Sequence, residues 1–183
     1  YGGNCGNMSS AVGLFAVEEG LVPPPPDGEA TVRIHNTNTN KIVISKFRVE
    51  GGIPAVEGGY ALPGVAGTGS RITLEFTDPG GASTGKLLPT GRRVDEFDIE
   101  GIGRIEASLV DAATPAVFVR AKDIGLSGTE SPGAIDAQRT IMVNLEQIRA
   151  EAAVRMGISP DTRAASESSP LVPKMAIVSP PAE

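Results

Sequence analysis

The chain has 183 residues, of which 40% are hydrophobic, and this apolar material suffices for the core of one ordinary domain or two small ones. Its formal net charge of -6 and its scattered Lys and Arg residues disfavour a nucleic-acid or anionic-membrane partner. A single Cys and a single His exclude an internal disulfide, a Cys-rich metal site and a multi-His metal cluster, so we expect metal-free chemistry.

The apolar runs and the two ends of the sequence indicate its cellular compartment and its place in a longer protein. No apolar run approaches the roughly 20 residues of a membrane-spanning helix, and the first residues lack the basic start and apolar block of a secretory signal. The cytoplasm is therefore the expected compartment. The sequence opens directly on a turn into a helix and closes soon after the strand-like run Met175-Ala176-Ile177-Val178, which suggests a piece of a longer protein.

The first predicted element is a helix over residues 8–19. Asn7 can cap it, because its side chain can accept from the free N–H groups of the first turn, and Gly20 ends it. Apolar residues cover most of its circumference, which predicts a helix enclosed by other structure. Residues 21–27, with four consecutive Pro, follow as an extended connector.

Alternating apolar and polar residues then predict strands on both sides of the turn signal Asp78-Pro79-Gly80-Gly81. A long helix follows, because Ser131 can cap it and Pro132 suits its first position. Apolar residues at helical spacing, Met142 among them, give this helix one buried face, and Arg149 is expected outside that face. The predicted strands span residues 30–36, 41–49, 71–76, 96–99, 104–111, 116–120 and 174–178, and the helix ends near Met156.

The sequence changes character between residues 78 and 95, and this change predicts two α+β units. We assign residues 1–92 to the first, with the helix 8–19 at its centre, and residues 93–183 to the second, with the helix 134–156 on its outer face.

The segment Gly2-Gly3-Asn4-Cys5-Gly6-Asn7 carries the strongest functional signal. Its glycines leave backbone N–H groups uncovered where a helix begins, and such a nest at the positive end of a helix dipole binds anions. The same field favours thiolate over thiol, so Cys5 could exchange protons near neutral pH. The alternative is an inert thiol packed in the core. A packed thiol does not need the surrounding glycines, and this favours the catalytic interpretation.

Residues 2–13, with Phe15-Ala16-Val17 and Glu19-Gly20-Leu21-Val22, resemble the GNCGN segment and central helix of the PrpF family, within the diaminopimelate epimerase superfamily. The order of the further matching segments, together with the unusual GNCGN cluster, makes the resemblance specific over essentially the whole chain. These segments are residues 30–34, Pro89-Thr90-Gly91, 101–104, 125–130, Arg155-Met156-Gly157 and 173–176.

The resemblance implies an α+β, diaminopimelate epimerase-like fold of two similar domains, each a curved mixed sheet around a central helix, with the active site between them. Family members move a proton across an allylic system in unsaturated di- and tricarboxylic acids, without metal or cofactor. Cys5 matches the family's Cys at the start of the first central helix. The family's catalytic Lys would precede Tyr1 and the second central helix would follow Glu183, so the second domain would be incomplete here.

A substrate carboxylate is expected beside Cys5, against Asn4, Gly6, Asn7 and Met8. Donors for further carboxylates could come from Gly-containing turns, although these residues could equally serve only to shape the turns. The candidates are Thr90, Ser127, Gly128 and Thr129.

Several other polar residues are expected to be solvated or structural. They are His35, Lys86, Arg92, Arg93 and the acidic run Asp95, Glu96, Asp98 and Glu100. Asp111 stands where the superfamily usually has Asn or Gly near the substrate. An Asp facing a polyanion is unfavourable unless it points away, and this leaves the substrate open.

The sequence thus predicts a cofactor-independent isomerase, with 2-methylaconitate cis-trans isomerisation as the specific reaction. 4-Oxalomesaconate tautomerisation and methylitaconate Δ-isomerisation are alternatives that the residues do not separate. From another class, a non-catalytic carboxylate-binding domain would keep the anion nest without proton transfer. The predicted partner is a small polycarboxylate, with no nucleic acid or membrane, and a homodimer is one assembly left open.

Overall fold

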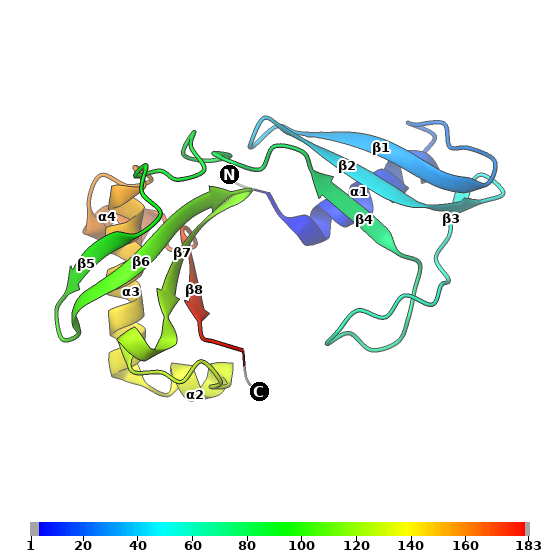
Figure 1. The fold of residues 1–183 in the computed structure, drawn as a ribbon. Coiled ribbons are helices and arrows are strands. Elements are labelled where there is room, and N and C mark those ends of the chain that lie inside the picture. Colours follow the sequence, from blue (N-terminus) through cyan, green and yellow to red (C-terminus); the bar gives the residue numbers. More distant parts are fainter. Residues whose placement is uncertain (1–3, 182–183) are drawn as a thin grey trace. The chain divides into compact units, whose positions relative to one another are not determined.

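A computed structural model describes residues 4–181 of the chain (Figure 1). Its contacts divide the chain into two units, Tyr1–Asp78 and Pro79–Glu183. Each unit combines helix with sheet, which confirms the α+β class. Residues 79–92, which the sequence assigned to the first unit, group with the second unit.

The first unit is one helix against a four-stranded antiparallel sheet. The central strand, β2, pairs with β1 on one side and with β3 and β4 on the other. The strand predictions are confirmed, although β3 was not anticipated and the sheet of this unit is antiparallel rather than mixed. The elements are α1 (Gly6–Glu18), β1 (Gly28–Asn36), β2 (Lys41–Glu50), β3 (Ile53–Pro54) and β4 (Ile72–Phe76).

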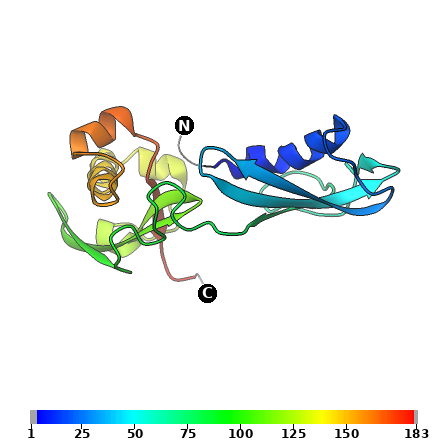
Figure 2. The same ribbon diagram turned by 90° about the horizontal axis from the view of Figure 1, so that it is seen from above.

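Helix α1 lies along one face of this sheet (Figure 2). Its buried residues Ser9, Gly13 and Val17 recur every four positions and form a single stripe toward the strands. At Gly13 the approach is so close that an added Cβ would lie 2.7 Å from Ser45 Oγ. Glycine is thus required where the helix crosses β2.

The expectation that α1 is enclosed is wrong for the described residues. Phe15 is 56% exposed and Val12 42% exposed, because one sheet covers only one stripe of the helix. Asn7 is also not the cap: the helix begins at Gly6 with Cys5 at the N-cap position and no side-chain capping bond. Gly20, at φ +68°, does follow the helix end as predicted.

The second unit is a mixed sheet in the order β5-β6-β7-β8, with β8 parallel to β7. Helix α3 packs on one face of it, and the core between them includes Phe97, Leu109, Val117, Ile148 and Ala152. The elements are β5 (Asp95–Ile99), β6 (Gly103–Ala112), β7 (Thr114–Arg120), the short 3-10 helix η1 (Ala121–Ile124), α2 (Pro132–Asp136), α3 (Arg139–Arg155), α4 (Thr162–Ser168) and β8 (Lys174–Val178).

The single helix predicted for residues 134–156 is two helices, α2 and α3. Its start is confirmed, because Ser131 Oγ accepts from the N–H of Ala134 and Pro132 occupies the first turn. Met142, expected in the buried face, is exposed, whereas Arg149, expected outside it, is buried. Helix α4 was not predicted, since its polar sequence lacks an apolar stripe.

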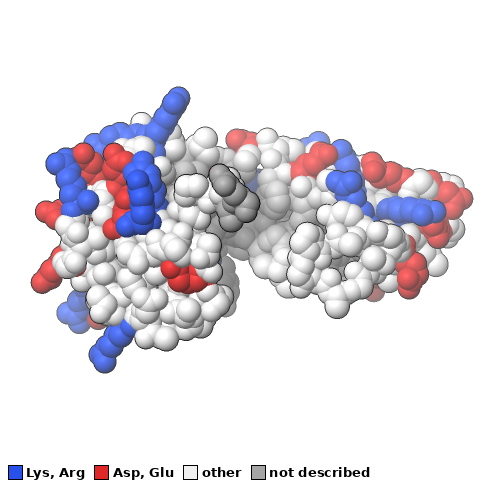
Figure 3. All heavy atoms as spheres, turned by 60° about the horizontal axis from the view of Figure 1, so that its bottom comes forward, with Lys and Arg blue, Asp and Glu red and all other residues white. Residues whose placement is uncertain are grey.

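No helix among residues 4–181 is long and apolar enough to cross a bilayer. Acidic and basic side chains are interspersed on the face shown in Figure 3, as their scatter along the sequence suggested.

Candidate active site

Cys5 lies at the point where extended backbone turns into α1. It is the N-cap residue, with φ -104° and ψ 109°, and its carbonyl accepts the first helical hydrogen bond from the N–H of Ser9 at 2.9 Å. Its side chain is a free, exposed thiol. Gly2 and Gly3, which the sequence placed in the nest, lie outside the described residues.

The backbone around Cys5 presents hydrogen-bond donors. The first turn of α1 has no side-chain cap, and no described residue accepts from the N–H groups of Gly6, Asn7 or Met8. All three residues are exposed. Unpaired N–H groups at a helix start attract anions through their partial positive charge. The arrangement can therefore hold a carboxylate next to a thiol.

Asn4, which precedes Cys5, is held by hydrogen bonds to its side chain. Its Oδ1 accepts from Ser9 Oγ at 3.0 Å and from Asn36 Nδ2. The sequence did not single out Ser9 or Asn36, because their contact with Asn4 depends on how the helix and sheet pack. The amide oxygen of Asn4 is thus engaged within the protein.

Thr90 is engaged by a buried carboxylate. Its hydroxyl donates to Asp95 Oδ2 at 2.8 Å, and Arg92 binds the other oxygen of Asp95 through Nε at 2.8 Å and Nη2 at 2.7 Å. Asp95 is buried, so the expectation of a solvated acidic run is wrong at this residue. A substrate contact by Thr90 remains a prediction, and its one hydroxyl hydrogen is already used.

The turn Ser127-Gly128-Thr129 binds a carboxylate of its own chain. The N–H groups of Ser127 and Gly128 donate to Glu130 at 2.7 and 2.9 Å, and Ser127 Oγ donates to it at 2.8 Å. These bonds, the one from the Ser127 backbone foremost, lower the pKa of Glu130 to about 2. The donors of Ser127 and Gly128 thus bind Glu130, and a substrate contact at this turn remains a prediction.

The carboxylate of Asp111 is directed into the second unit and not toward solvent. It is fully buried, and its Oδ2 accepts from the N–H groups of Ser83 and Thr84 and from the Thr84 hydroxyl at 2.6–2.9 Å. The carboxylate thereby organises a turn of the second unit. This removes the conflict between an acidic side chain at this position and a polyanionic ligand.

The candidate residues thus fall into separate groups. Asn4, Cys5, Gly6, Asn7 and Met8 form one continuous group in the first unit. Thr90 and residues 127–129 occupy two different turns of the second unit. The described residues contain no cluster of three or more His, Cys, Asp or Glu suited to a metal ion.

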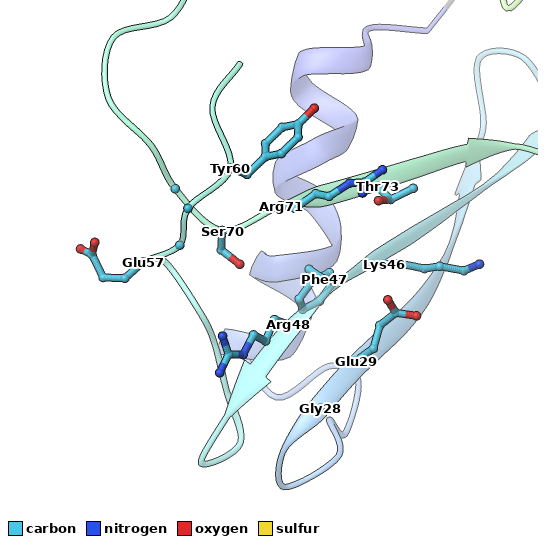
Figure 4. Close-up of a pocket in the computed structure, with 13 residues that line it drawn as sticks. Gly28, Glu29, Lys46, Phe47, Arg48, Glu57, Tyr60, Ser70, Arg71 and Thr73 are labelled. Carbon is cyan, nitrogen blue, oxygen red and sulfur yellow. The ribbon is translucent and has the colours of Figure 1, made fainter. Parts of the chain in front are cut away.

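A pocket of about 690 Å³ lies elsewhere in the first unit (Figure 4). Lys46 and Arg48 of β2 line it from the side of the strand opposite to Ser45 and Val49, which are buried beneath α1. Arg71 also lines it, with its guanidinium 5.6 Å from the ring centre of Tyr60. None of the predicted site residues contributes to this pocket.

Comparison with known proteins shows which family the chain belongs to. A family model described as PrpF protein matches residues 1–183. The chain is 42% identical over 181 residues to the 3-methylitaconate isomerase of Eubacterium barkeri, covering 99% of this chain and 47% of that protein. It is 35% identical over 187 residues to the 2-methyl-aconitate isomerase of Shewanella oneidensis, again covering 99% of this chain and 47% of the relative.

A solved structure shows the same architecture. The crystal structure of a methylitaconate-delta-isomerase superposes with a TM-score of 0.86 at 42% sequence identity, covering 98% of this chain and 46% of that one. This confirms that the chain carries part of a diaminopimelate epimerase-like fold. The chain spans about half the length of the relatives it matches. On its sequence, its fold and the match along its whole length, the chain belongs to the PrpF family.

Proposed function

We propose that the protein to which this chain belongs is a cofactor-independent isomerase, which moves an allylic proton in an unsaturated polycarboxylic acid. The observation that carries the proposal is the exposed thiol of Cys5 at the N-cap of α1, beside backbone donors that no described residue accepts from. Membership of a family whose relatives carry isomerase names supports it.

The proposed reaction transfers one proton. A base removes it from the allylic carbon, and the electron pair delocalises into the neighbouring carboxylate as a dienolate. For cis-trans isomerisation an acid returns a proton to the same carbon after rotation in the dienolate, and for Δ-isomerisation it returns a proton at the other end of the allylic system. Cys5 takes one of these two roles, and the residues described here do not supply the other. Backbone donors at Gly6, Asn7 and Met8 act most strongly on the charge that develops in the transition state.

Three substrates are each supported by a relative. 2-Methylaconitate is the proposed substrate, supported by the relative from Shewanella oneidensis, and methylitaconate is the second candidate, supported by the higher identity to the relative from Eubacterium barkeri. 4-Oxalomesaconate is a third, since a (4E)-oxalomesaconate Delta-isomerase from Novosphingobium is 35% identical over 178 residues. Asn4, Thr90, Ser127, Gly128 and Thr129 are proposed as further substrate contacts.

The proposed compartment is the cytoplasm. An acid/base Cys5 must remain a free thiol, and free thiols persist where the surroundings are reducing. No metal or other cofactor enters the proposal, because proton transfer requires only an acid and a base.

Exchange of substrate protons with solvent tests the function. The whole protein is incubated in D₂O with each acid, and deuterium entering the allylic position is followed by NMR. The wild type should incorporate deuterium, and Cys5→Ser should slow this by about 10²- to 10⁴-fold, the usual contribution of one acid/base group. Incorporation by Cys5→Ser at the wild-type rate would contradict the assignment.

Gly6→Val tests the carboxylate position. A Cβ at Gly6 meets no other atom within 4 Å, so the substitution leaves the fold intact while it covers the donors. Calorimetric titration should show about tenfold weaker binding of an aconitate-like acid, a loss of roughly 1.4 kcal/mol. Arg93→Ala, at an exposed position, is the control. Binding without deuterium incorporation by the wild type would favour the non-catalytic carboxylate-binding domain.

A further inference from the structure

The residue before Cys5 is fixed by two other parts of the first unit. Asn4 Oδ1 accepts from Ser9 Oγ in the first turns of α1 and from Asn36 Nδ2 at the end of β1. Ser9 Oγ also lies 2.9 Å from the backbone oxygen of Cys5, so its single hydrogen is shared between two acceptors. The backbone that carries the thiol is therefore tied to both the helix and the sheet.

The turn after β1 fixes the orientation of Asn36. Asn36 Oδ1 accepts from the backbone N–H groups of Asn38 at 2.9 Å and Thr39 at 3.3 Å, as in an Asx turn. Because the amide oxygen is used on that side, the amide NH₂ is directed to Asn4. Asn36 is thus a preorganised donor and is not a side chain that happens to lie nearby.

We propose that Asn36 is a positioning residue for Cys5 and acts through Asn4. The proposal rests on the isomerase function given above. The field of a helix start acts only within its first turn, and a displacement of about 1 Å in a catalytic arrangement can cost about 10²-fold in rate. A bond from the sheet to Asn4 keeps the thiol beside the donors of Gly6 and Asn7 before substrate arrives.

A double-mutant cycle tests the bond between Asn36 and Asn4 without substrate. The alkylation rate of Cys5 by iodoacetamide is measured in the whole protein, on the peptide that carries Cys5, over a range of pH. Asn36→Ala and Asn4→Ala should each slow alkylation near neutral pH by about fivefold, the factor that corresponds to one ordinary hydrogen bond. The double variant should be no slower than either single variant.

Asn38→Ala is the matched control. Asn38 belongs to the same turn, its side chain is exposed, and among residues 4–181 only its backbone N–H takes part in the hydrogen bonds of the turn. Iodoacetamide should alkylate Cys5 of this variant at the wild-type rate. Asn4→Ala leaves the turn after β1 intact, so the test stays decisive even where Asn36→Ala disturbs the hairpin.

The enzymatic readout separates positioning from general loss of structure. In the whole enzyme, Asn36→Ala should lower kcat by about 10- to 100-fold, with KM changed by less than about threefold. The proposal would be overturned if Cys5 of Asn36→Ala were alkylated as fast as Cys5 of Asn38→Ala, or if Asn4→Ala left the alkylation rate unchanged. Additive effects of the two substitutions in the cycle would also overturn it. If the wild type isomerises none of the acids, the proposed function fails, while the alkylation cycle still decides whether Asn36 positions the thiol.

Discussion

Single carboxylates determine much of the local backbone in the second unit. Asp95 accepts hydrogen bonds from Thr90 and Arg92, and Asp111 accepts them from Ser83 and Thr84. Glu130 accepts hydrogen bonds from the backbone of the turn that precedes it. Each carboxylate exchanges water for several fixed donors, and charge-assisted bonds of this kind are roughly twice as strong as neutral ones. The turns that supply the donors are therefore held in one conformation.

Glu130 gives a pH dependence with a defined sign. Its pKa falls from an ordinary value of 4.5 to about 2 in the folded chain. A lowered folded pKa stabilises the fold above the unfolded value, and this stabilisation is lost as pH falls from about 4.5 toward 2. The urea midpoint of the wild type should exceed that of Glu130→Gln near neutral pH, and the two should converge at low pH.

A difference between these two proteins that stays constant from pH 6 to pH 2.5 would contradict this prediction. Glu167→Gln is a suitable control, because Glu167 makes only an exposed ion pair with Arg163.

At the residue scale, features that depend on adjacent residues could be predicted from the sequence. Cys5 and the donors of Gly6 to Met8 follow from a short motif, because a glycine-rich helix start is encoded by adjacent residues. Asn36 and the burial of Asp95 could not be predicted, since both depend on contacts with other segments. The sequence of an acidic run is the same whether its first carboxylate is solvated or enclosed by Thr90 and Arg92.

Among the elements, α3 and the segment after it are joined by Arg149. Its guanidinium pairs with both oxygens of Glu146 and donates to the carbonyl oxygens of Ala165, Ser169 and Val172 at 3.0–3.1 Å. Ala165 lies in α4, and Val172 lies just before β8. One side chain thus satisfies backbone acceptors over a stretch that has few apolar contacts of its own.

Arg149→Met should destabilise the chain, because Val172 loses the donor to its carbonyl and Ala165 and Ser169 each lose one of two donors. Glu146 loses its charged partner and keeps the hydroxyl of Ser166. The expected cost is about 2–3 kcal/mol, because a hydrogen bond from a charged donor contributes about 1.5–3 kcal/mol and the Glu146 side chain, 46% exposed, can regain water. Arg163→Ala, which removes an exposed pair with Glu167, should cost less than about 1 kcal/mol. Urea unfolding measures both, and equal midpoints for the two variants would contradict the assigned role.

At the element scale, strands were predicted better than helices. Alternating patterns located seven of the eight strands that residues 4–181 form, because most of these strands bury alternate side chains, whereas β3 has only two residues. For α1, apolar residues around the circumference predicted enclosure, but one sheet covers one stripe. In α3 a charged residue was assumed to face water, and the sequence does not show that Arg149 finds backbone acceptors.

At the scale of the molecule, the two units have separate cores. One core joins Val17 of α1 to Phe47 and Val49 of β2, and the other centres on Leu109 and Ile148. No core cluster of the described residues contains members of both units. Separate cores favour local opening of one unit without the other.

Hydrogen exchange on the whole protein can test this independence. Leu109→Ala should cost about 2–5 kcal/mol and speed exchange in β5, β6 and β7, while the amides of β1 and β2 keep their wild-type rates. Phe47→Ala should give the reverse pattern. Faster exchange throughout both units in either variant would show that they open together.

The attachment of residues 79–88 to β6 bears on how the gene can be divided. The segment is bonded to that strand through Gly81, Leu87 and the buried Asp111. A shortened chain that starts at residue 93 would leave the carboxylate of Asp111 without its donors, whereas one that starts at Pro79 would retain them. Recombination between family members should therefore tolerate a crossover at codon 78 better than one at codon 92.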